Sequence, residues 1–207
     1  MPPSPGSTTA HTRTGTAFGP GSGTARVPRV TGRLATLVEE IRAVVALGLP
    51  PDVTARLVGK KLTPQLGAAD LLTSAQCQGD PDHYRQHLLH AEDDGSFSLV
   101  ALVWLPGQCT PVHDHVAWCV TGVHTGEEHE RRYRLLPAAA PGRRARLVAT
   151  EDVVNAPGAV CGFAPPGDIH RVRNGGTRRA ISLHVYGADV SRLGSSVRRV
   201  YDVPADA

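Results

Sequence analysis

Two hydrophobic patterns divide the chain. From Gly32 to about residue 72, apolar residues recur every three to four positions, which is typical of amphipathic helices. From about residue 84 onward, they alternate with polar residues over short segments, which is typical of strands with one buried face. We therefore expect a small helical region followed by a β-rich domain.

The helical region is predicted to hold two helices and a shorter third one. The first begins near Gly32 and ends near Gly48, because the prolines that follow at 50 and 51 prevent its continuation. Asp52 is expected to cap the second helix. Thr63 and Pro64 are expected to open the third, which would extend to Leu72.

The β-rich part begins with a predicted hairpin of residues 84–90 and 96–104, because the acidic and glycine-containing segment 92–95 supplies turn chemistry. Further strand-like segments lie at 112–124, 129–136, 145–150, 159–163, 169–174 and 179–187. Short strands at regular spacing predict a sandwich or barrel, and a double-sheet jelly roll fits best. We expect the Arg-rich stretch 189–203 to be irregular.

These patterns predict four parts. Residues 1–30 are rich in Pro, Gly, Ser and Thr and cannot bury enough apolar surface to fold, so we expect a disordered tail. Residues 31–80 form a helical region packed on the barrel, residues 81–190 form the barrel, and residues 191–207 form a C-terminal extension.

Composition excludes several classes of protein. With 41% hydrophobic and 20% charged residues, the chain has a soluble globular composition. The net charge is only +3 and no DNA-reading motif is present, so we expect no nucleic-acid partner. No apolar run could span a bilayer, and no secretion signal opens the chain, so we expect no membrane partner and a cytoplasmic location. The four cysteines form no CxxC pair, so a structural zinc knuckle is not expected.

Two histidines separated by one residue suggest a metal site. His113 and His115 would share one face of a strand, where both imidazoles can reach one ion. Asp114 between them points the other way and is expected to have a structural role. His170 is the candidate for a third ligand, because a Pro-Pro-Gly turn at 165–167 leads into a strand there.

These residues belong to two spaced motifs. The first reads Gly107, five residues, His113-Asp114-His115, three residues, Cys119, six residues, Gly126. The second reads Pro165-x-Gly167-x-x-His170-x-x-x-Asn174. Together they resemble the paired motifs of the cupin superfamily. That resemblance implies a mainly β fold, a double-stranded β-helix or jelly-roll barrel, here preceded by the small helical region.

Cys119 departs from the common cupin pattern, which has a glutamate ligand at this position. A thiolate ligand would favour zinc or another soft metal. If Cys119 does not bind the metal, three imidazoles leave open coordination positions, which dioxygen and a substrate require. The sequence leaves both alternatives open.

A late segment makes the resemblance more specific. In Ser182-Leu183-His184-Val185-Tyr186, the serine, histidine and tyrosine share one face of a strand and can form a hydrogen-bonded relay. With Cys119 in the glutamate position, this segment resembles the cysteine dioxygenase family of thiol dioxygenases, over about residues 80–190.

The family resemblance implies roles for these residues. His113, His115 and His170 would bind iron(II), and Tyr186 would lie beside dioxygen and substrate. His184 would orient the Tyr186 hydroxyl, with Ser182 behind it. Cys119 would face Tyr186 and form a thioether crosslink with it, as in animal members of the family.

The residue that holds a substrate carboxylate is less well defined. Animal members of the family have an arginine where this chain has Gln86. Bacterial members with glutamine there resemble 3-mercaptopropionate dioxygenases, in which the arginine comes from the C-terminal region. Arg192, Arg198 and Arg199 are candidates, because a guanidinium can hold a carboxylate through two hydrogen bonds.

The expected function is an iron(II)-dependent thiol dioxygenase that inserts both atoms of O2 into the sulfur of L-cysteine or a close analogue, giving a sulfinic acid. Its partners would be a small thiol and O2, and the protein would be a monomer or homodimer. Alternatives are a 3-mercaptopropionate dioxygenase, a cupin oxygenase that oxidatively rearranges cysteine in a biosynthetic pathway, and a zinc or nickel isomerase-like cupin. A non-catalytic metal-binding cupin is a further alternative, although the relay favours an enzyme.

Overall fold

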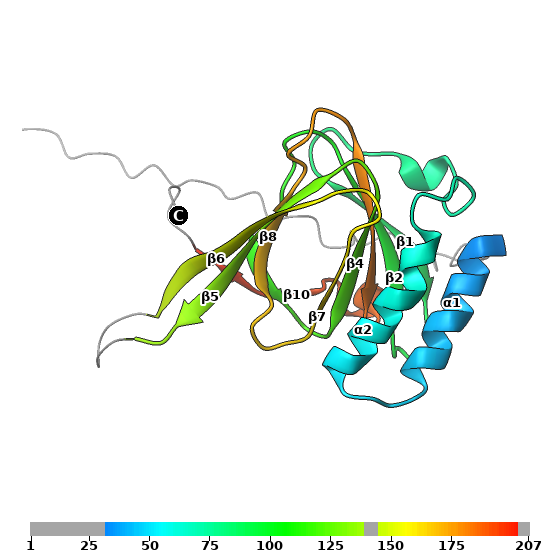
Figure 1. Ribbon diagram of the computed structural model, residues 1–207, viewed down its shortest axis with the longest axis horizontal. Coiled ribbons are helices and arrows are strands. Elements are labelled where there is room, and N and C mark those ends of the chain that lie inside the picture. The colour runs from blue at the N-terminus through cyan, green and yellow to red at the C-terminus, as the bar shows by residue number, and fades with distance from the viewer. Residues whose placement is uncertain (1–31, 139–144, 203–207) are drawn as a thin grey trace, which may run out of the picture.

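Two five-stranded antiparallel sheets face each other in the computed structural model, which describes residues 32–138 and 145–202 (Figure 1). The first sheet has the order β1 (Arg85–Ala91), β2 (Ser98–Trp104), β9 (Ala180–Tyr186), β4 (Cys119–Thr125) and β7 (Val160–Phe163). The second has the order β10 (Val197–Tyr201), β3 (Val112–His115), β8 (Ile169–Arg173), β5 (Glu128–Leu136) and β6 (Arg146–Asn155). The predicted disordered tail at 1–30 lies outside the described residues.

Each sheet combines strands that are far apart in the sequence. The chain passes from β3 in one sheet to β4 in the other, and later from β8 back to β9. This alternation between two facing sheets is a double-stranded β-helix, so the prediction of a mainly β cupin barrel is confirmed. The small helical region that precedes the barrel is also present.

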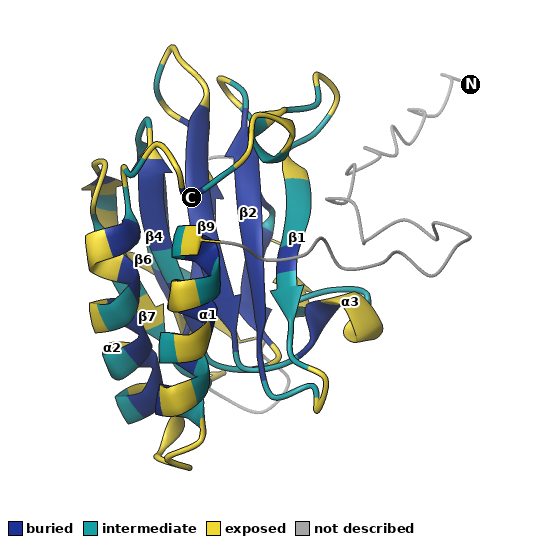
Figure 2. Ribbon diagram, turned by 90° about the vertical axis from the view of Figure 1, so that its right-hand side faces the viewer, coloured by how far each residue is buried: buried dark blue, intermediate teal, exposed yellow. Residues whose placement is uncertain are grey.

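The alternation of side chains along β2 and β9 separates two apolar layers. Leu99 and Leu183 point outward and pack with the helices. Val100 and Tyr186 point into the barrel, in a second cluster that includes Cys119. Both strands are buried along their whole length, and Figure 2 shows them in dark blue. Polar side chains on the inner face are therefore held in a closed interior.

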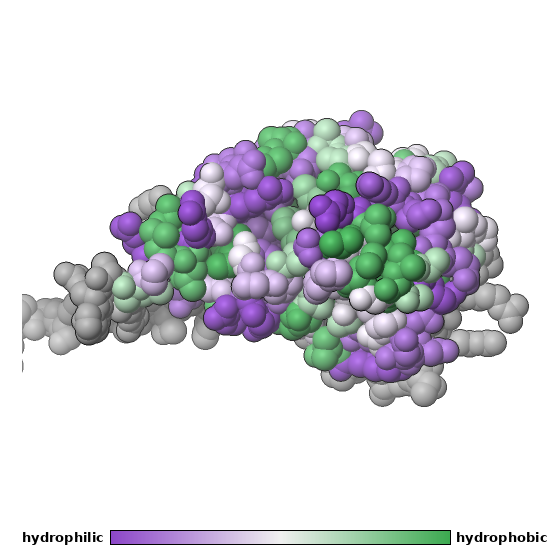
Figure 3. Space-filling model, turned by 60° about the horizontal axis from the view of Figure 1, so that its bottom comes forward, coloured by the Kyte–Doolittle hydropathy of each residue, from purple (hydrophilic) through white to green (hydrophobic). Residues whose placement is uncertain are grey.

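Two helices cover the outer face of the first sheet (Figures 1 and 2). They are α1 (Gly32–Val45) and α2 (Pro51–Leu62), and each buries an apolar stripe that includes Ile41 in the first and Val58 in the second. Across the described residues, no helix combines the length and apolar character needed to cross a bilayer. On the face shown in Figure 3, separate apolar areas are surrounded by polar side chains.

The structure corrects two details of the helical region. The helix expected from Thr63 to Leu72 is only the 3-10 turn η1 (Thr63–Gln65), and a second such turn, η2 (Ala75–Cys77), follows. Gly67, with φ of 79°, lies in the left-handed region and is incompatible with a continuing helix. Asp52 lies inside the first turn of α2, not at its cap, because Pro51 itself begins the helix.

Two strand predictions were also wrong. The segment 112–124 is not one strand but two, because the chain crosses between sheets at 116–118. The stretch 189–203, expected to be irregular, contains the short helix α3 (Val190–Leu193) and strand β10, which pairs with β3. Apolar alternation does not reveal β10, because charged groups anchor it.

That anchor is the carboxylate of Asp114, which points away from its two neighbouring histidines, as the strand pattern predicts. Its Oδ2 accepts hydrogen bonds from Arg198 Nη2 at 2.6 Å, Arg199 Nη2 at 3.0 Å and Tyr201 Oη at 2.7 Å. Burial opposes ionisation, but these donors outweigh it and lower the pKa of Asp114 to about 2. Asp114 is therefore charged at neutral pH and holds β10 against β3.

Replacing Asp114 with asparagine should lower the free energy of unfolding at pH 7 by about 1–2 kcal/mol, since the partner guanidinium groups are partly exposed and screened. The folded pKa is below the unfolded one, so the stabilisation is present above about pH 4 and is lost as the pH falls towards about 2. Urea unfolding at a series of pH values should show that the difference in free energy of unfolding between the wild type and Asp114→Asn decreases over that interval. The exposed Asp152 serves as a control, because Asp152→Asn should have a small effect. A deficit for Asp114→Asn that does not change with pH would contradict this assignment.

Candidate metal centre

Three histidines converge inside the barrel. His113 and His115 lie on β3, and His170 lies on β8 directly opposite His113. One nitrogen from each ring lies within 4.8 Å of the others, and all three side chains are buried. The structure thus brings together the three histidines that the two motifs single out, from strands more than fifty residues apart in the sequence.

The protein fixes the orientation of each ring through its Nδ1 atom. His113 Nδ1 donates to the Pro111 carbonyl at 3.0 Å, and His115 Nδ1 donates to Asp168 Oδ2 at 3.0 Å. His170 Nδ1 donates to Glu130 Oε1 at 2.8 Å. An imidazole that donates from Nδ1 offers the lone pair of Nε2 to a metal.

The electrostatics also favour metal binding. Burial lowers the pKa of His113 and of His170, so both rings are neutral at neutral pH, which is the ligand form. Burial opposes ionisation of Glu130, but its bonds from His170 and Arg132 lower its pKa to about 2. Neutral imidazoles backed by carboxylates suit iron, zinc, copper or nickel. The residues therefore fit a divalent transition-metal ion.

Sequence reasoning did not identify Glu130 and Asp168. Asp168 precedes His170 by two residues, and its Oδ2 also accepts from the His115 backbone N–H at 2.9 Å. Glu130 lies on β5, and its partner His170 is forty residues away along the chain. The only sequence signal for Glu130 is that an acidic residue occupies a strand position that should face the barrel interior.

The relay expected in β9 is present. Ser182 Oγ lies 2.9 Å from His184 Nε2, and His184 Nδ1 lies 3.2 Å from Tyr186 Oη. Burial lowers the pKa of His184 to about 3, so its ring is neutral. The Tyr186 ring is centred 6.2 Å from that of His115, so the relay ends beside the three histidines.

Cys119 lies directly opposite Tyr186, because β4 and β9 pair in that register. It is fully buried, and burial raises the pKa of its thiol. The metal-binding group found in the described part of the chain consists of histidines alone, so Cys119 is outside it. This placement favours Cys119 as a neighbour of Tyr186 over Cys119 as a ligand.

A cavity of about 310 Å³ reaches His113 from the surface between β1 and the segment before β10. Gln86, Arg198 and Arg199 line it, together with Tyr84, Thr110, Pro111, Gly194, Ser195, Ser196, Val197 and Val200. Arg192 is not among the residues that line this cavity. Its side chain is 64% exposed and contacts Asp189 and the Asp93 carbonyl.

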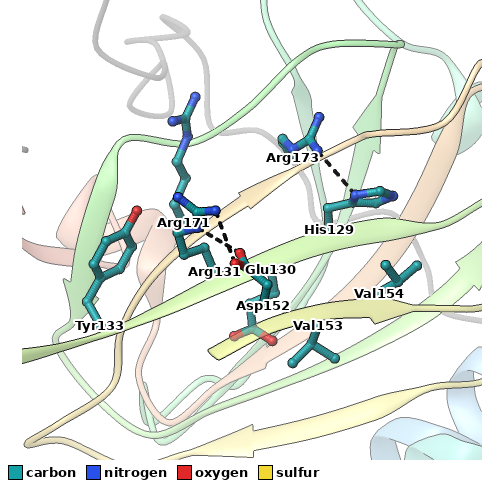
Figure 4. Close-up of a pocket in the computed structure, with 9 residues that line it drawn as sticks. All are labelled: His129, Glu130, Arg131, Tyr133, Asp152, Val153, Val154, Arg171 and Arg173. Carbon is teal, nitrogen blue, oxygen red and sulfur yellow. Dashed lines mark hydrogen bonds and ion pairs between the residues drawn. The ribbon is translucent and has the colours of Figure 1, made fainter. Parts of the chain in front are cut away.

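A second cleft, of about 430 Å³, lies on the solvent side of β5, β6 and β8 (Figure 4). Arg131 holds Asp152 through two hydrogen bonds of 2.7 and 3.0 Å, and Arg173 donates to His129 at 3.3 Å. Of the residues around the metal centre, only Glu130 also lines this cleft. The cavity beside Gln86, by contrast, is lined by His113 itself.

The fold and the three histidines define a metal-binding cupin. Among solved structures, the chain is similar to a protein from Thermus thermophilus, with 22% identity over 59% of this chain and 98% of that chain, at a TM-score of 0.42. It is also similar to a cupin superfamily protein from Desulfitobacterium hafniense, with 14% identity over 60% and 95% of the two chains and a TM-score of 0.42. These likenesses say nothing of the activity.

The particular family follows from the sequence match. Residues 71–195, more than half of the chain, match the family cysteine dioxygenase type I. The chain belongs to this family, whose members are dioxygenases. The match extends beyond both ends of the segment over which the motifs alone suggested the resemblance.

Proposed function

We propose that this chain is an iron(II)-dependent thiol dioxygenase that transfers both atoms of O2 to the sulfur of L-cysteine or a close analogue, giving a sulfinic acid. The observation that carries the proposal is the placement of Tyr186 beside the three histidines, at 6.2 Å between its ring and that of His115. A buried tyrosine held by its own hydrogen-bonded relay has no evident use in a cupin that only binds a metal.

Each residue of the site has a separate role in this proposal. His113, His115 and His170 hold the iron through Nε2, with their other nitrogens fixed by the protein. When bound, iron(II) supplies the redox chemistry for dioxygen and the substrate sulfur. Tyr186 places its hydroxyl beside the reacting groups, and the buried surroundings keep that hydroxyl protonated by raising its pKa.

The cavity beside His113 has the size and polarity for a small thiol acid. Gln86 of β1 and Arg198 and Arg199 of β10 are among the residues that line it. Both arginines contact Asp114, but a guanidinium has five N–H donors, so further donors are available to a substrate carboxylate. Gln86 opposite C-terminal arginines favours 3-mercaptopropionate as the second candidate substrate.

Oxygen consumption by the iron-loaded protein tests the proposal. We expect uptake with cysteine or 3-mercaptopropionate, and much less with cysteamine, which lacks a carboxylate for the arginines. Mass spectrometry of the product should show addition of two oxygen atoms. A rearranged product would favour the biosynthetic oxygenase, and no uptake with any of the three thiols would overturn the proposal.

A further inference from the structure

One buried acid is unexplained by the metal centre. Glu128 begins β5, only 2% of it is exposed, and it lies opposite Asn155 of β6. Its Oε1 atom has no hydrogen-bond partner among the described residues. Burying a carboxyl group without a cation is costly, so a residue of this kind needs a structural or functional reason.

Its surroundings place Glu128 at the inner end of the relay. The Ser182 hydroxyl and the Trp104 indole N–H are the donor groups beside its carboxyl, and Trp104 Nε1 donates to Ser182 Oγ at 3.2 Å. The next group after Ser182 is His184, at 2.9 Å. Glu128, Ser182, His184 and Tyr186 therefore form one series of polar groups that runs through the barrel to the metal centre.

The charged and titratable groups around Glu128 do not neutralise it. On its own strand, Glu130 is ionised and repels a second negative charge. Cys161 on β7 and Tyr186 on β9 also interact with it electrostatically, and neither is a cation. Burial and Glu130 outweigh the donors and raise the pKa of Glu128 to about 7, so its proton is exchangeable near neutral pH.

We propose that Glu128 is a positioning residue that sets the direction of the hydrogen bonds from Ser182 through His184 to Tyr186. It thereby decides whether the Tyr186 hydroxyl donates to, or accepts from, a group at the metal centre. The catalytic consequence of this change in hydrogen-bond direction rests on the proposed function. The change itself, called the switch below, requires neither bound iron nor turnover.

When Glu128 is protonated, its O–H donates to Ser182 Oγ. Ser182 then donates its own proton to His184 Nε2, so the neutral ring of His184 carries its proton on Nδ1 and donates to Tyr186 Oη. The O–H of Tyr186 is then available to donate towards the three histidines.

When Glu128 is ionised, every hydrogen bond reverses. Ser182 donates to the carboxylate, His184 donates from Nε2 to Ser182, and Tyr186 donates to His184 Nδ1. Tyr186 then offers only lone pairs to the metal centre. Ser182, His184 and Tyr186 carry one proton each in both states, so the single proton lost from Glu128 goes to solvent.

Nuclear magnetic resonance of the full chain tests this switch. The nitrogen shifts of labelled His184 distinguish the Nδ1–H from the Nε2–H form, and the carboxyl carbon shift of Glu128 reports its ionisation. Between about pH 5.5 and 8.5, we expect His184 to change from Nδ1–H to Nε2–H with the same midpoint as Glu128. The measurement is made on metal-free protein and on protein loaded with zinc, which is diamagnetic.

Variants test whether Glu128 itself controls the form of His184. In Glu128→Gln, His184 should keep one form at every pH, whereas Glu127→Gln, a neighbour whose side chain is 45% exposed, should keep the switch. Should Glu128→Gln not fold, Ser182→Ala should leave Glu128 titrating while His184 no longer follows. A wild-type His184 that never changes form, or a change that persists in Glu128→Gln, would overturn the proposal. Absence of oxygen uptake would count against the thiol dioxygenase alone.

Discussion

Replacement of His170 by alanine should abolish iron binding and, with it, oxygen uptake. His170 supplies one of three ligand nitrogens, and its loss also leaves the buried carboxylate of Glu130 without its partner at 2.8 Å. The loss of affinity should exceed the roughly 10- to 100-fold that follows removal of a group that only orients a ligand. Metal analysis after loading with iron(II) should find about one ion per wild-type chain and only background in the variant.

His129 provides the matched control. It lies on the same sheet but on the solvent side, where it contacts Glu127 and Arg173. His129→Ala should therefore bind iron as the wild type does. Full iron retention in His170→Ala would show that the three histidines are not the metal site.

Replacement of Tyr186 by phenylalanine should leave iron binding intact and lower kcat about 100-fold. The substitution removes only the hydroxyl that His184 contacts at 3.2 Å and keeps the ring packed in the barrel interior. Steady-state oxygen uptake should show a smaller change in KM than in kcat, because the substrate carboxylate is held elsewhere. Tyr133→Phe, which changes a tyrosine in a separate cluster, should retain activity. An unchanged kcat in Tyr186→Phe would remove Tyr186 from the reaction.

The variant Cys119→Ser distinguishes the hydroxyl of Tyr186 from the proposed crosslink. Cys119 lies directly across from Tyr186, and a thioether between them forms with loss of two hydrogens to an oxidant, here O2. Intact mass spectrometry should find wild-type protein two hydrogens lighter than its sequence, and Cys119→Ser at its sequence mass. If Cys119→Ser lowers kcat as much as Tyr186→Phe, the crosslink accounts for the loss. If it lowers kcat much less, the hydroxyl does.

The three histidines and the relay could be predicted because their geometry is mostly local. His113 and His115 share a strand face through the period of two, as do Ser182, His184 and Tyr186. His170 follows a Pro-Pro-Gly turn that starts its strand. The motifs therefore predict which side chains point into the barrel without knowledge of how the sheets face each other.

Hydrophobic patterns failed to predict strand β10, and they wrongly predicted a helix from Thr63 to Leu72. The segment 197–201 has two arginines and exposed positions, so its hydrophobic pattern does not indicate a strand. It becomes one because Asp114, more than eighty residues earlier, binds three of its side chains. In the other direction, Leu66, Leu71 and Leu72 suggest a helix, but the chain turns at Gly67 instead.

The sequence by itself determined the fold class, the family, and the histidines and tyrosine that point into the barrel, because strand periodicity and turn residues act over a few positions. Only the tertiary structure decided what surrounds them. Glu130, Asp168 and Glu128 reach the site across strands whose pairing depends on the whole barrel. Burial then lowers the pKa of His184 to about 3 and raises that of Glu128 to about 7, which no local pattern can indicate.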